Sequence, residues 1–389
     1  MNRIARPVVA ALVSLAAVCL HGAPTAAEPP AAGPVGNPAG FVIRRGVNLS
    51  HWFSQCEDWA PRERFITEKD IAFIAGLGYD HVRLPVDEKE LWLPDGTPNE
   101  AAFALLQRAL EWCRARGLRV IVDLHTVRTH HFNAVNEGRT NTLWSNPRAQ
   151  EGFLRLWSEL SSRLRLHPVS QVAYEILNEP VADDHEDWNR LVAATLRQIR
   201  SAEPQRVVVI GSNRWQIPST LPFLKVPAGD PNIILSTHTY SPLILTHHLA
   251  NWMPLKSYTG PVHYPGKPVA RDVFERLMAS GDKSITDLVS NAGDEWNRDR
   301  IRRELEPAIH RARELGLQLY CGEFGCLPTV PRADRLAYYG DIVSALEAGG
   351  AAWANWEYKG DFGILEWQAT THTVGAPDRE LIQTLLGPR

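Results

Sequence analysis

Short apolar runs alternate with longer amphipathic stretches along the chain from Phe41 onward. Each short run is rich in Val, Ile, Leu or aromatic residues, as expected for a strand that is buried on both faces. Alternation of such runs with helical stretches favours a parallel sheet wrapped by helices. The eight predicted strands are residues 42–49, 81–86, 119–125, 172–179, 207–213, 233–240, 317–323 and 351–357.

Sequence signals mark where the helices between these strands begin and end. Thr67 to Asp70 opens a helix before Ile71, and Gly76-Leu77-Gly78 closes it. The same pattern predicts helices over residues 99–116, 147–166, 186–202 and 294–315. Eight strand-helix units in about 350 residues predict an α/β fold, the (β/α)8 TIM barrel. The alternative, an open doubly wound sheet, is disfavoured because no Gly-x-Gly-x-x-Gly follows the first strand.

One connection is much longer than the others. Residues 241–293, 53 in all, separate the sixth strand from the helix at 294–315. A loop of this length is usually functional or carries small elements of its own. We expect a short helix over residues 271–279, and an irregular wall over 242–268 that stands at the end of the barrel where chemistry is done.

The start of the chain differs from the rest in composition. Residues 1–27 read as a signal peptide, because Arg3 and Arg6 precede a short apolar run and small residues end at Ala27. Residues 28–39 are rich in Pro, Ala and Gly and are expected to form a tether. This organisation predicts one folded domain over residues 40–389 in a protein that is secreted or periplasmic. The alternative is that the first segment is kept as an anchor.

The cysteines and the net charge limit the classes of function. Four cysteines follow the leader, namely Cys56, Cys113, Cys321 and Cys326, so up to two disulfides could form, and the sequence does not pair them. A net charge of −3 without a lysine-rich block argues against nucleic acid and membrane partners. Thirteen Trp residues are many for this length, and flat amphipathic rings suit stacking on sugars or bases.

Polar residues cluster at the carboxyl ends of the predicted strands, which is the catalytic position in a barrel. A buried strand has no packing reason to end this way eight times. The residues are Asn48, Arg83, Asp123 and His125, Asn178 and Glu179, Asn213, His238 and Tyr240, Glu323, and Trp356 and Glu357.

Glu179 and Glu323 are the carboxylates that stand out, because they end the fourth and seventh strands, which face each other across a barrel. Such a pair beside aromatic platforms suits glycosidic cleavage. Arg83, if it reaches Glu323, would keep that carboxylate ionised, and the Tyr240 hydroxyl would assist by hydrogen bonding. Glu179 would then keep a raised pKa and act as the acid, while Asn178 could donate to a sugar 2-hydroxyl.

The segment VAYEILNEPV at residues 172–181 resembles the full signature of glycoside hydrolase family 5, the cellulase family of clan A. Supporting motifs in the order of that family are RGVN at 45–48, VRLP at 82–85, DLH at 123–125, HTY at 238–240 and GEFG at 322–325. The resemblance implies a retaining hydrolase with Glu179 as acid/base and Glu323 as nucleophile. It also implies that Arg83, His125, Asn178, His238, Tyr240 and Trp356 line the subsite of the sugar that is cleaved.

Family members act mostly on β-linked glucans and mannans, and the segment at 246–252 resembles a loop of bacterial cellulase-like members. The resemblance therefore implies an endoglucanase acting on β-1,4-glucan. Open alternatives are β-mannan, β-1,3- or β-1,6-glucan, and a site that acts on chain ends. A non-catalytic sugar-binding barrel is disfavoured because both carboxylates are present, and a triad esterase because no Gly-x-Ser-x-Gly occurs.

Further expectations concern the aromatic residues and the histidines. Trp215 and Trp52 are predicted to be additional sugar platforms, against the alternative that they cover the core. Alternation along the last strand favours Trp356 over Trp353 as the platform at the cleaved sugar. The pairs His130-His131 and His247-His248 lack the spacing of a zinc site. We expect no metal and no cofactor, a β-linked polysaccharide or oligosaccharide as the partner, and a monomer.

Overall fold

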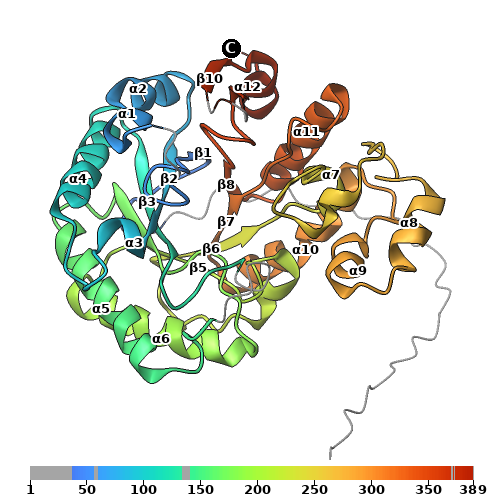
Figure 1. The fold of residues 1–389 in the computed structure, drawn as a ribbon. Coiled ribbons are helices and arrows are strands. Elements are labelled where there is room, and N and C mark those ends of the chain that lie inside the picture. Colours follow the sequence, from blue (N-terminus) through green and yellow to red (C-terminus); the bar gives the residue numbers. More distant parts are fainter. Residues whose placement is uncertain (1–36, 57–59, 134–140, 369–370, 372, 389) are drawn as a thin grey trace, which may run out of the picture. The chain divides into compact units, whose positions relative to one another are not determined.

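Eight parallel strands close into a barrel in the order β1 to β8 (Figure 1). The computed structural model describes residues 37–56, 60–133, 141–368, 371 and 373–388, so the predicted signal peptide and most of the predicted tether lie outside the described residues. The TIM barrel prediction is confirmed. The strands are β1 Arg45–Asn48, β2 His81–Asp87, β3 Arg119–Thr126, β4 Val172–Glu175, β5 Val208–Gly211, β6 Ile233–His238, β7 Gln318–Glu323 and β8 Ala352–Asn355.

β1 closes the barrel because it pairs on both sides. Gly46 lies opposite His81 of β2, and Arg45 lies opposite Trp353 of β8. Gly46 is required at this point, since a Cβ there would lie 2.3 Å from the His81 ring. The strand register therefore depends on a close approach that only glycine permits.

Helices surround the barrel, and those predicted from the sequence are present. Their caps follow the expected chemistry: the Asn99 side chain accepts from the amide of Ala102, and Gly316 ends its helix with a left-handed φ of 64°. The helices are α1 Arg62–Phe65, α2 Glu68–Gly76, α3 Glu88–Leu91, α4 Glu100–Ala115, α5 Pro147–Leu164, α6 His185–Ala202, α7 Leu243–Thr246, α8 Arg271–Met278, α9 Lys283–Val289, α10 Arg298–Leu315, α11 Arg332–Ala348 and α12 Arg379–Leu386.

The regular repeat fails between β5 and β6. This connection contains only the 3-10 helix η1, Pro218–Phe223, where a strand-helix unit was expected. Pro222 lies inside η1 and has no N–H to donate, so an α-helix cannot continue through it.

The inside of the barrel changes from apolar to charged along its axis. Near the amino ends of the strands, a closed apolar cluster contains Phe41, Ile121, Ala173, Ile234 and Tyr320. Two residues further along β3 and β4, alternation places Asp123 and Glu175 on the same inner face. The apolar layer fills the barrel near the amino ends of the strands, and the charged layer next to it supports the site.

The long connection after β6 carries α7, the 3-10 helix η2 (Pro254–Ser257), α8 and α9. The short helix predicted over residues 271–279 is present as α8, whereas α9 was not predicted. The connection packs on the barrel through buried residues such as Val262 and Val289, and the Tyr264 hydroxyl donates to Asp341 of α11 at 2.8 Å. It is therefore a folded element of the domain.

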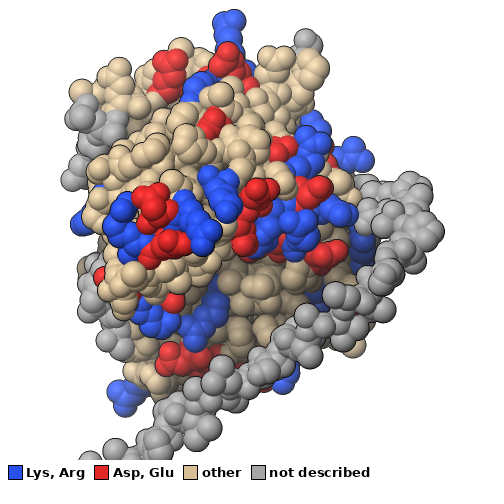
Figure 2. All heavy atoms as spheres, turned by 90° about the vertical axis from the view of Figure 1, so that its right-hand side faces the viewer, with Lys and Arg blue, Asp and Glu red and all other residues tan. Residues whose placement is uncertain are grey.

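Positive and negative side chains are mixed on the face that carries α8 and α9 (Figure 2). Arg271 pairs with Glu275 and Lys283 pairs with Asp287, each one helical turn apart. Mixed charge of this kind offers no single-sign field for a polyanion on this face.

The end of the chain adds elements that the sequence did not predict. The strands β9 (Leu365–Gln368) and β10 (Thr373–Pro377) form a two-stranded antiparallel sheet, and α12 follows. Arg332 of α11 pairs with Asp378 just before α12. Among the described helices, none combines the length and apolar character needed to cross a membrane.

The cysteines of the described segments form no disulfide. Cys56, Cys113, Cys321 and Cys326 are all free thiols, and the last three are buried. Of the arrangements that the sequence left open, the structure has the one without bridges.

Candidate active site

The predicted site residues converge at the carboxyl ends of the strands. Arg83 comes from β2, His125 from β3, His238 from β6 and Glu323 from β7. Further members come from the segments after strands, namely Asn178 and Glu179 after β4, Tyr240 after β6 and Trp356 after β8. The β6–β7 register shifts between Thr237 and His238, and this shift places His238 directly opposite Glu323.

Glu179 does not belong to a strand, although the sequence placed it at the end of one. β4 stops at Glu175, and the Asn178 amide still donates to the Leu124 carbonyl at 3.0 Å. Glu179 then adopts a left-handed φ of 44° before Pro180. A non-glycine residue in this region carries strain that is typical of functional positions.

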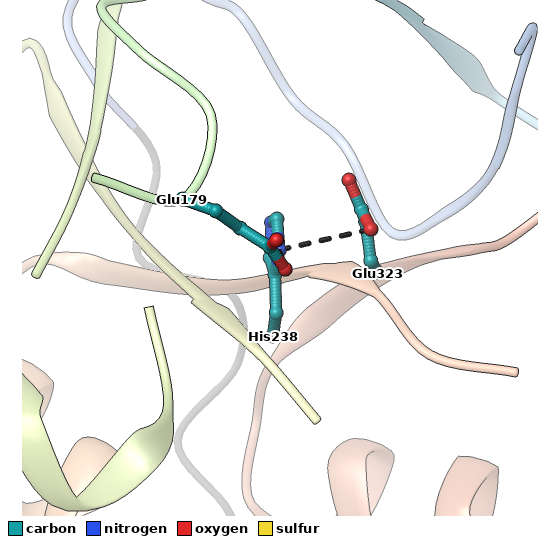
Figure 3. Close-up of side chains that lie close together, drawn as sticks. All are labelled: Glu179, His238 and Glu323. Atoms are coloured by element: carbon teal, nitrogen blue, oxygen red, sulfur yellow. Dashed lines mark hydrogen bonds and ion pairs between the residues drawn. The ribbon is translucent and has the colours of Figure 1, made fainter. Parts of the chain in front are cut away.

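The two carboxylates and the His238 imidazole lie close together (Figure 3). One oxygen of Glu179, one of Glu323 and a ring nitrogen of His238 all lie within 4.8 Å of one another. The Nδ1 atom of His238 is 2.9 Å from Glu179 Oε1 and 3.8 Å from Glu323 Oε2. Burial lowers the pKa of His238 well below its ordinary value, so the imidazole is neutral.

Glu323 is held by a cation and a hydroxyl. Arg83 Nη1 donates to Glu323 Oε1 at 2.6 Å, and the Tyr240 hydroxyl donates to Oε2 at 3.0 Å. Burial raises the pKa of Glu323, and the Arg83 charge opposes that rise. Burial also raises the pKa of Tyr240 well above its ordinary value, so its hydroxyl keeps the proton that it donates.

Glu179 lies in the same buried region, and no arginine contact to its side chain is seen among the described residues. Its pKa is raised well above the ordinary value, first by burial and then by the negative charge of Glu323. The two environments therefore separate the carboxylates: Glu179 has the more strongly raised pKa and suits a proton carrier, and Arg83 makes Glu323 the more acidic of the two.

His125 and Asn178 each use one polar atom within the protein and leave the other without a protein partner. Asp123 Oδ2 lies 2.7 Å from His125 Nδ1, and Arg83 Nη2 donates to Asn178 Oδ1 at 2.8 Å. The buried atoms His125 Nε2 and Asn178 Nδ2 have no hydrogen-bond partner among the described residues. Burial lowers the pKa of His125 to about 4, so its free nitrogen is an acceptor, whereas Asn178 Nδ2 is a donor.

Trp356 and Trp353 separate as alternation predicts. Trp353 is fully buried on the outer side of β8, where it packs edge-on against Phe324 at 5.7 Å. Trp356 lies at the barrel mouth, in a cluster with Phe362, Leu327 and the partly buried Tyr240. Of the two rings, Trp356 is therefore the one beside the site residues.

The two tryptophans predicted from the sequence as additional sugar platforms differ in how far they are exposed. Trp215 is 38% exposed, and its Nε1 donates to the Phe132 carbonyl at 3.0 Å. Trp52 is 1% exposed, because it stacks on Trp112 of α4 and its Nε1 donates to the Arg62 carbonyl. The prediction that Trp52 binds sugar is corrected here, since a packed ring leaves no face for a ligand.

Sequence reasoning missed part of the polar layer beneath the site. Glu175 and Gln216 are buried, and Gln216 Nε2 donates to Glu175 Oε1 at 3.3 Å. The signal for Glu175 was a charged residue within a strand that is otherwise buried on both faces.

Lys359, which follows β8, has a structural role. Its Nζ pairs with Asp70 at 2.7 Å and donates to the Phe65 carbonyl.

A metal ion is not needed to explain the grouping. Among the described residues, the group close enough to share an ion consists of Glu179, His238 and Glu323 themselves. An ion there would occupy the atoms assigned above to proton transfer and charge. Paired-carboxylate cleavage requires none.

Known proteins resemble this chain over most of its length. The model of the family described as Cellulase (glycosyl hydrolase family 5) matches residues 37–361. Endoglucanase C of Acetivibrio thermocellus is 32% identical over 323 residues, which are 82% of this chain and 91% of the relative. Cellodextrinase A of Ruminococcus flavefaciens is 29% identical over 300 residues, 76% of this chain and 80% of the relative.

Solved structures agree on the fold. The endoglucanase Cel5A of Thermotoga maritima superimposes with a TM-score of 0.68 at 23% identity, covering 91% of this chain and 100% of the other. The barrel, the paired carboxylates and the matched family model together place the chain in glycoside hydrolase family 5, and it is a glycoside hydrolase.

Proposed function

We propose that the protein is an exported retaining endoglucanase that cleaves β-1,4-glucosidic bonds in glucans. The observation that carries the mechanism is the spacing of Glu179 and Glu323, which offer oxygens within 4.8 Å of each other. Retaining enzymes hold their carboxyl groups about 5–5.5 Å apart, whereas inverting enzymes need about 6.5–9.5 Å to admit a water. The short separation favours retention.

In the first step, a Glu323 oxygen attacks the anomeric carbon while Glu179 gives its proton to the leaving oxygen. This forms a glycosyl ester on Glu323 and releases the aglycone as an alcohol. In the second step, the ionised Glu179 takes a proton from water as that water attacks the same carbon and frees Glu323. Arg83 and Tyr240 hold the nucleophile ionised before the attack.

Orientation of the sugar is assigned to the polar atoms that have no partner within the protein. Asn178 Nδ2 donates to the 2-hydroxyl, a contact that strengthens in the transition state. His125 Nε2 accepts from a neighbouring hydroxyl, and the Trp356 ring supports the apolar face of the sugar.

The substrate class is supported by the names of the relatives. Endoglucanase C covers most of both chains, which supports an endo-acting enzyme on β-1,4-glucan. Cellodextrinase A supports a second candidate with the same chemistry, an enzyme for short cellodextrins.

The experiment is product analysis with carboxymethyl-cellulose, cellopentaose, β-mannan, laminarin and pustulan in parallel. Rapid viscosity loss on carboxymethyl-cellulose is expected for the wild type, and Glu323→Gln is expected to abolish it. Glu203→Gln serves as the matched control, since Glu203 is a buried carboxylate paired with Arg206 at the end of α6, away from the site. Cleavage of cellopentaose without viscosity loss would favour the cellodextrinase candidate, and cleavage confined to another polymer would overturn the substrate proposal.

Export is proposed on the sequence of residues 1–27 alone. Expression of the full chain in a Gram-negative host, followed by fractionation and amino-terminal sequencing, tests it. A mature protein that begins near Glu28 outside the cytoplasm is expected, and an uncleaved cytoplasmic chain would contradict the proposal. Elution as a monomer in size-exclusion chromatography is expected.

A further inference from the structure

The Arg83 guanidinium is saturated with acceptors. It is fully buried, and each of its five N–H groups faces an oxygen. The acceptors are Glu175 Oε2 on Nε (2.6 Å), Glu323 Oε1 (2.6 Å) and Asn48 Oδ1 (3.1 Å) on Nη1, and Asn178 Oδ1 (2.8 Å) and Asp123 Oδ2 (2.9 Å) on Nη2. The Arg83 cation therefore faces three carboxylates. Glu175, the carboxylate at its Nε atom, has no role in the two chemical steps.

Glu175 lies where it can act on the site without touching the substrate. It is fully buried on the inner face of the barrel at the end of β4. One of its oxygens accepts from Arg83 Nε, and the other accepts from Gln216 Nε2. The residue opposite Glu175 on β5 is Val209, whose side chain is apolar. Arg83 and Gln216 are therefore the donors that hold the Glu175 carboxylate.

Gln216 is held in a costly backbone conformation. Arg214, Trp215 and Gln216 have φ values of 65°, 59° and 54°, and this left-handed backbone is unfavourable for residues other than glycine. The amides of Arg214 and Trp215 both donate to the Pro180 carbonyl, directly after Glu179. Such strain persists only where surrounding contacts determine the conformation.

Two further contacts fix the same turn. The Gln216 carbonyl accepts from the His238 amide at 2.9 Å and from the Thr237 hydroxyl at 2.7 Å. Gly211 makes room for the side chain, since a Cβ there would lie 1.9 Å from Gln216 Nε2. The turn thus directs one amide nitrogen at Glu175.

We propose that Glu175 is a positioning residue: it anchors Arg83 against Glu323, its negative charge opposes loss of the proton from Glu179, and Gln216 keeps it in place. The inference rests on the proposed retaining mechanism. The charged and titratable groups around Glu175 are Arg83 from β2, Asp123 from β3, Tyr320 from β7, and Glu179 beyond β4.

The sign of the effect follows from these charges. Burial raises the pKa of Glu175 to about 7, so the side chain is fully charged only in the alkaline range. In that range the charge of Glu175 contributes to the raised pKa of Glu179. Removal of the charge lowers the pKa of Glu179, so the acid loses its proton at lower pH and the alkaline limb of the activity profile moves down.

The test is the pH dependence of kcat/KM for Glu175→Gln with cellopentaose, whose leaving group needs a proton. The alkaline limb is expected to move to lower pH by about half to one unit, which is about three- to tenfold in rate on that limb. The new amide can still accept from Arg83 through its oxygen. Gln216 Oε1 has no hydrogen-bond partner in the described part of the chain, so after an amide flip it can accept from the new amide nitrogen. With 2,4-dinitrophenyl β-cellobioside, which needs no proton, the limb is expected to stay in place.

Gln216→Leu is the second variant and preserves the test if Glu175→Gln does not fold. It removes the donor to Glu175 but keeps the backbone contacts, so a smaller shift in the same direction is expected. Glu203→Gln, the remote buried control, is expected to lower the melting temperature without moving either limb. Folded Glu175→Gln and Gln216→Leu proteins with an unchanged alkaline limb would overturn the proposal, as would an equal shift in Glu203→Gln. A wild type that cleaves neither substrate would instead refute the proposed function.

Discussion

The indole of Trp356 lies parallel to the imidazole of His125, with ring centroids 5.7 Å apart and an angle of 11° between their planes. His125 is in turn held by Asp123 through its Nδ1 atom. The peptide between Trp356 and Glu357 is cis, which is uncommon for a residue other than proline. The Trp356 and His125 rings are thus packed against each other at the barrel mouth.

Trp356→Ala is expected to lower kcat/KM on cellopentaose about tenfold or more, because the ring belongs to the site cluster. Trp356 is itself buried, so this variant also loses stability. Trp353→Ala is the matched control. Trp353 is fully buried in the main core, so its truncation costs about 3–5 kcal/mol of unfolding free energy. Denaturant unfolding and kinetics are measured for both variants. The prediction fails if Trp356→Ala, like Trp353→Ala, loses only stability.

Glu179→Gln is expected to lose about 10²- to 10⁴-fold in kcat on cellopentaose, because the leaving oxygen departs without a proton. The first step on 2,4-dinitrophenyl β-cellobioside needs no acid, so a burst of dinitrophenol is expected, followed by slow turnover. Stopped-flow absorbance measures the burst. Absence of the burst, with the first step slowed as much on this substrate as on cellopentaose, would remove Glu179 from the acid role.

Tyr240→Phe is expected to move the acid limb of the kcat/KM profile upward by about one to two pH units. The hydroxyl donates to Glu323, and a hydrogen bond to an ionised group is worth about 1.5–3 kcal/mol. Without it the pKa of Glu323 rises, so the nucleophile becomes protonated at a higher pH. A profile with an unmoved acid limb would show that Arg83 alone sets the ionisation of Glu323.

The thiols are expected to be inert in the folded protein. Burial raises the pKa of Cys56, Cys113 and Cys326 to about 12, and reactivity requires the thiolate. Ellman's reagent should therefore react slowly with the native protein, and with four thiols of residues 28–389 after unfolding. An unchanged melting temperature in dithiothreitol is the accompanying expectation, and fewer reactive thiols in the unfolded protein would reveal a disulfide.

The barrel and the two carboxylates could be predicted because both are local in sequence. Each strand is a short apolar run, and most site residues stand near or beyond the end of one. Arg83, predicted at a strand end, is instead the third residue of β2 and reaches the site through its long side chain. Arg83 and Tyr240 were expected to contact Glu323, and both do.

What the sequence could not show depends on contacts between distant segments. A tryptophan in a loop either offers its face to a ligand or covers the core, depending on which side chains pack on it. The Trp112 ring of α4 packs on Trp52. The role of Glu175 required the end of β4 and the left-handed turn at Gln216, and neither leaves a periodic signal. The same holds for α9, whose seven residues are too few to display a helical period.

The closure of the barrel through β1 has a consequence for synthesis on the ribosome. The earliest strand needs the last one, since Arg45 and Gly46 pair with Trp353 and Ala354. Until residues 352–355 emerge, β1 and β7 each present a row of unpaired amides and carbonyls, which can template pairing with another chain. A nascent or truncated chain that lacks β8 therefore leaves the β1 edge unpaired, and the β7 edge joins it once residues 318–323 have been made.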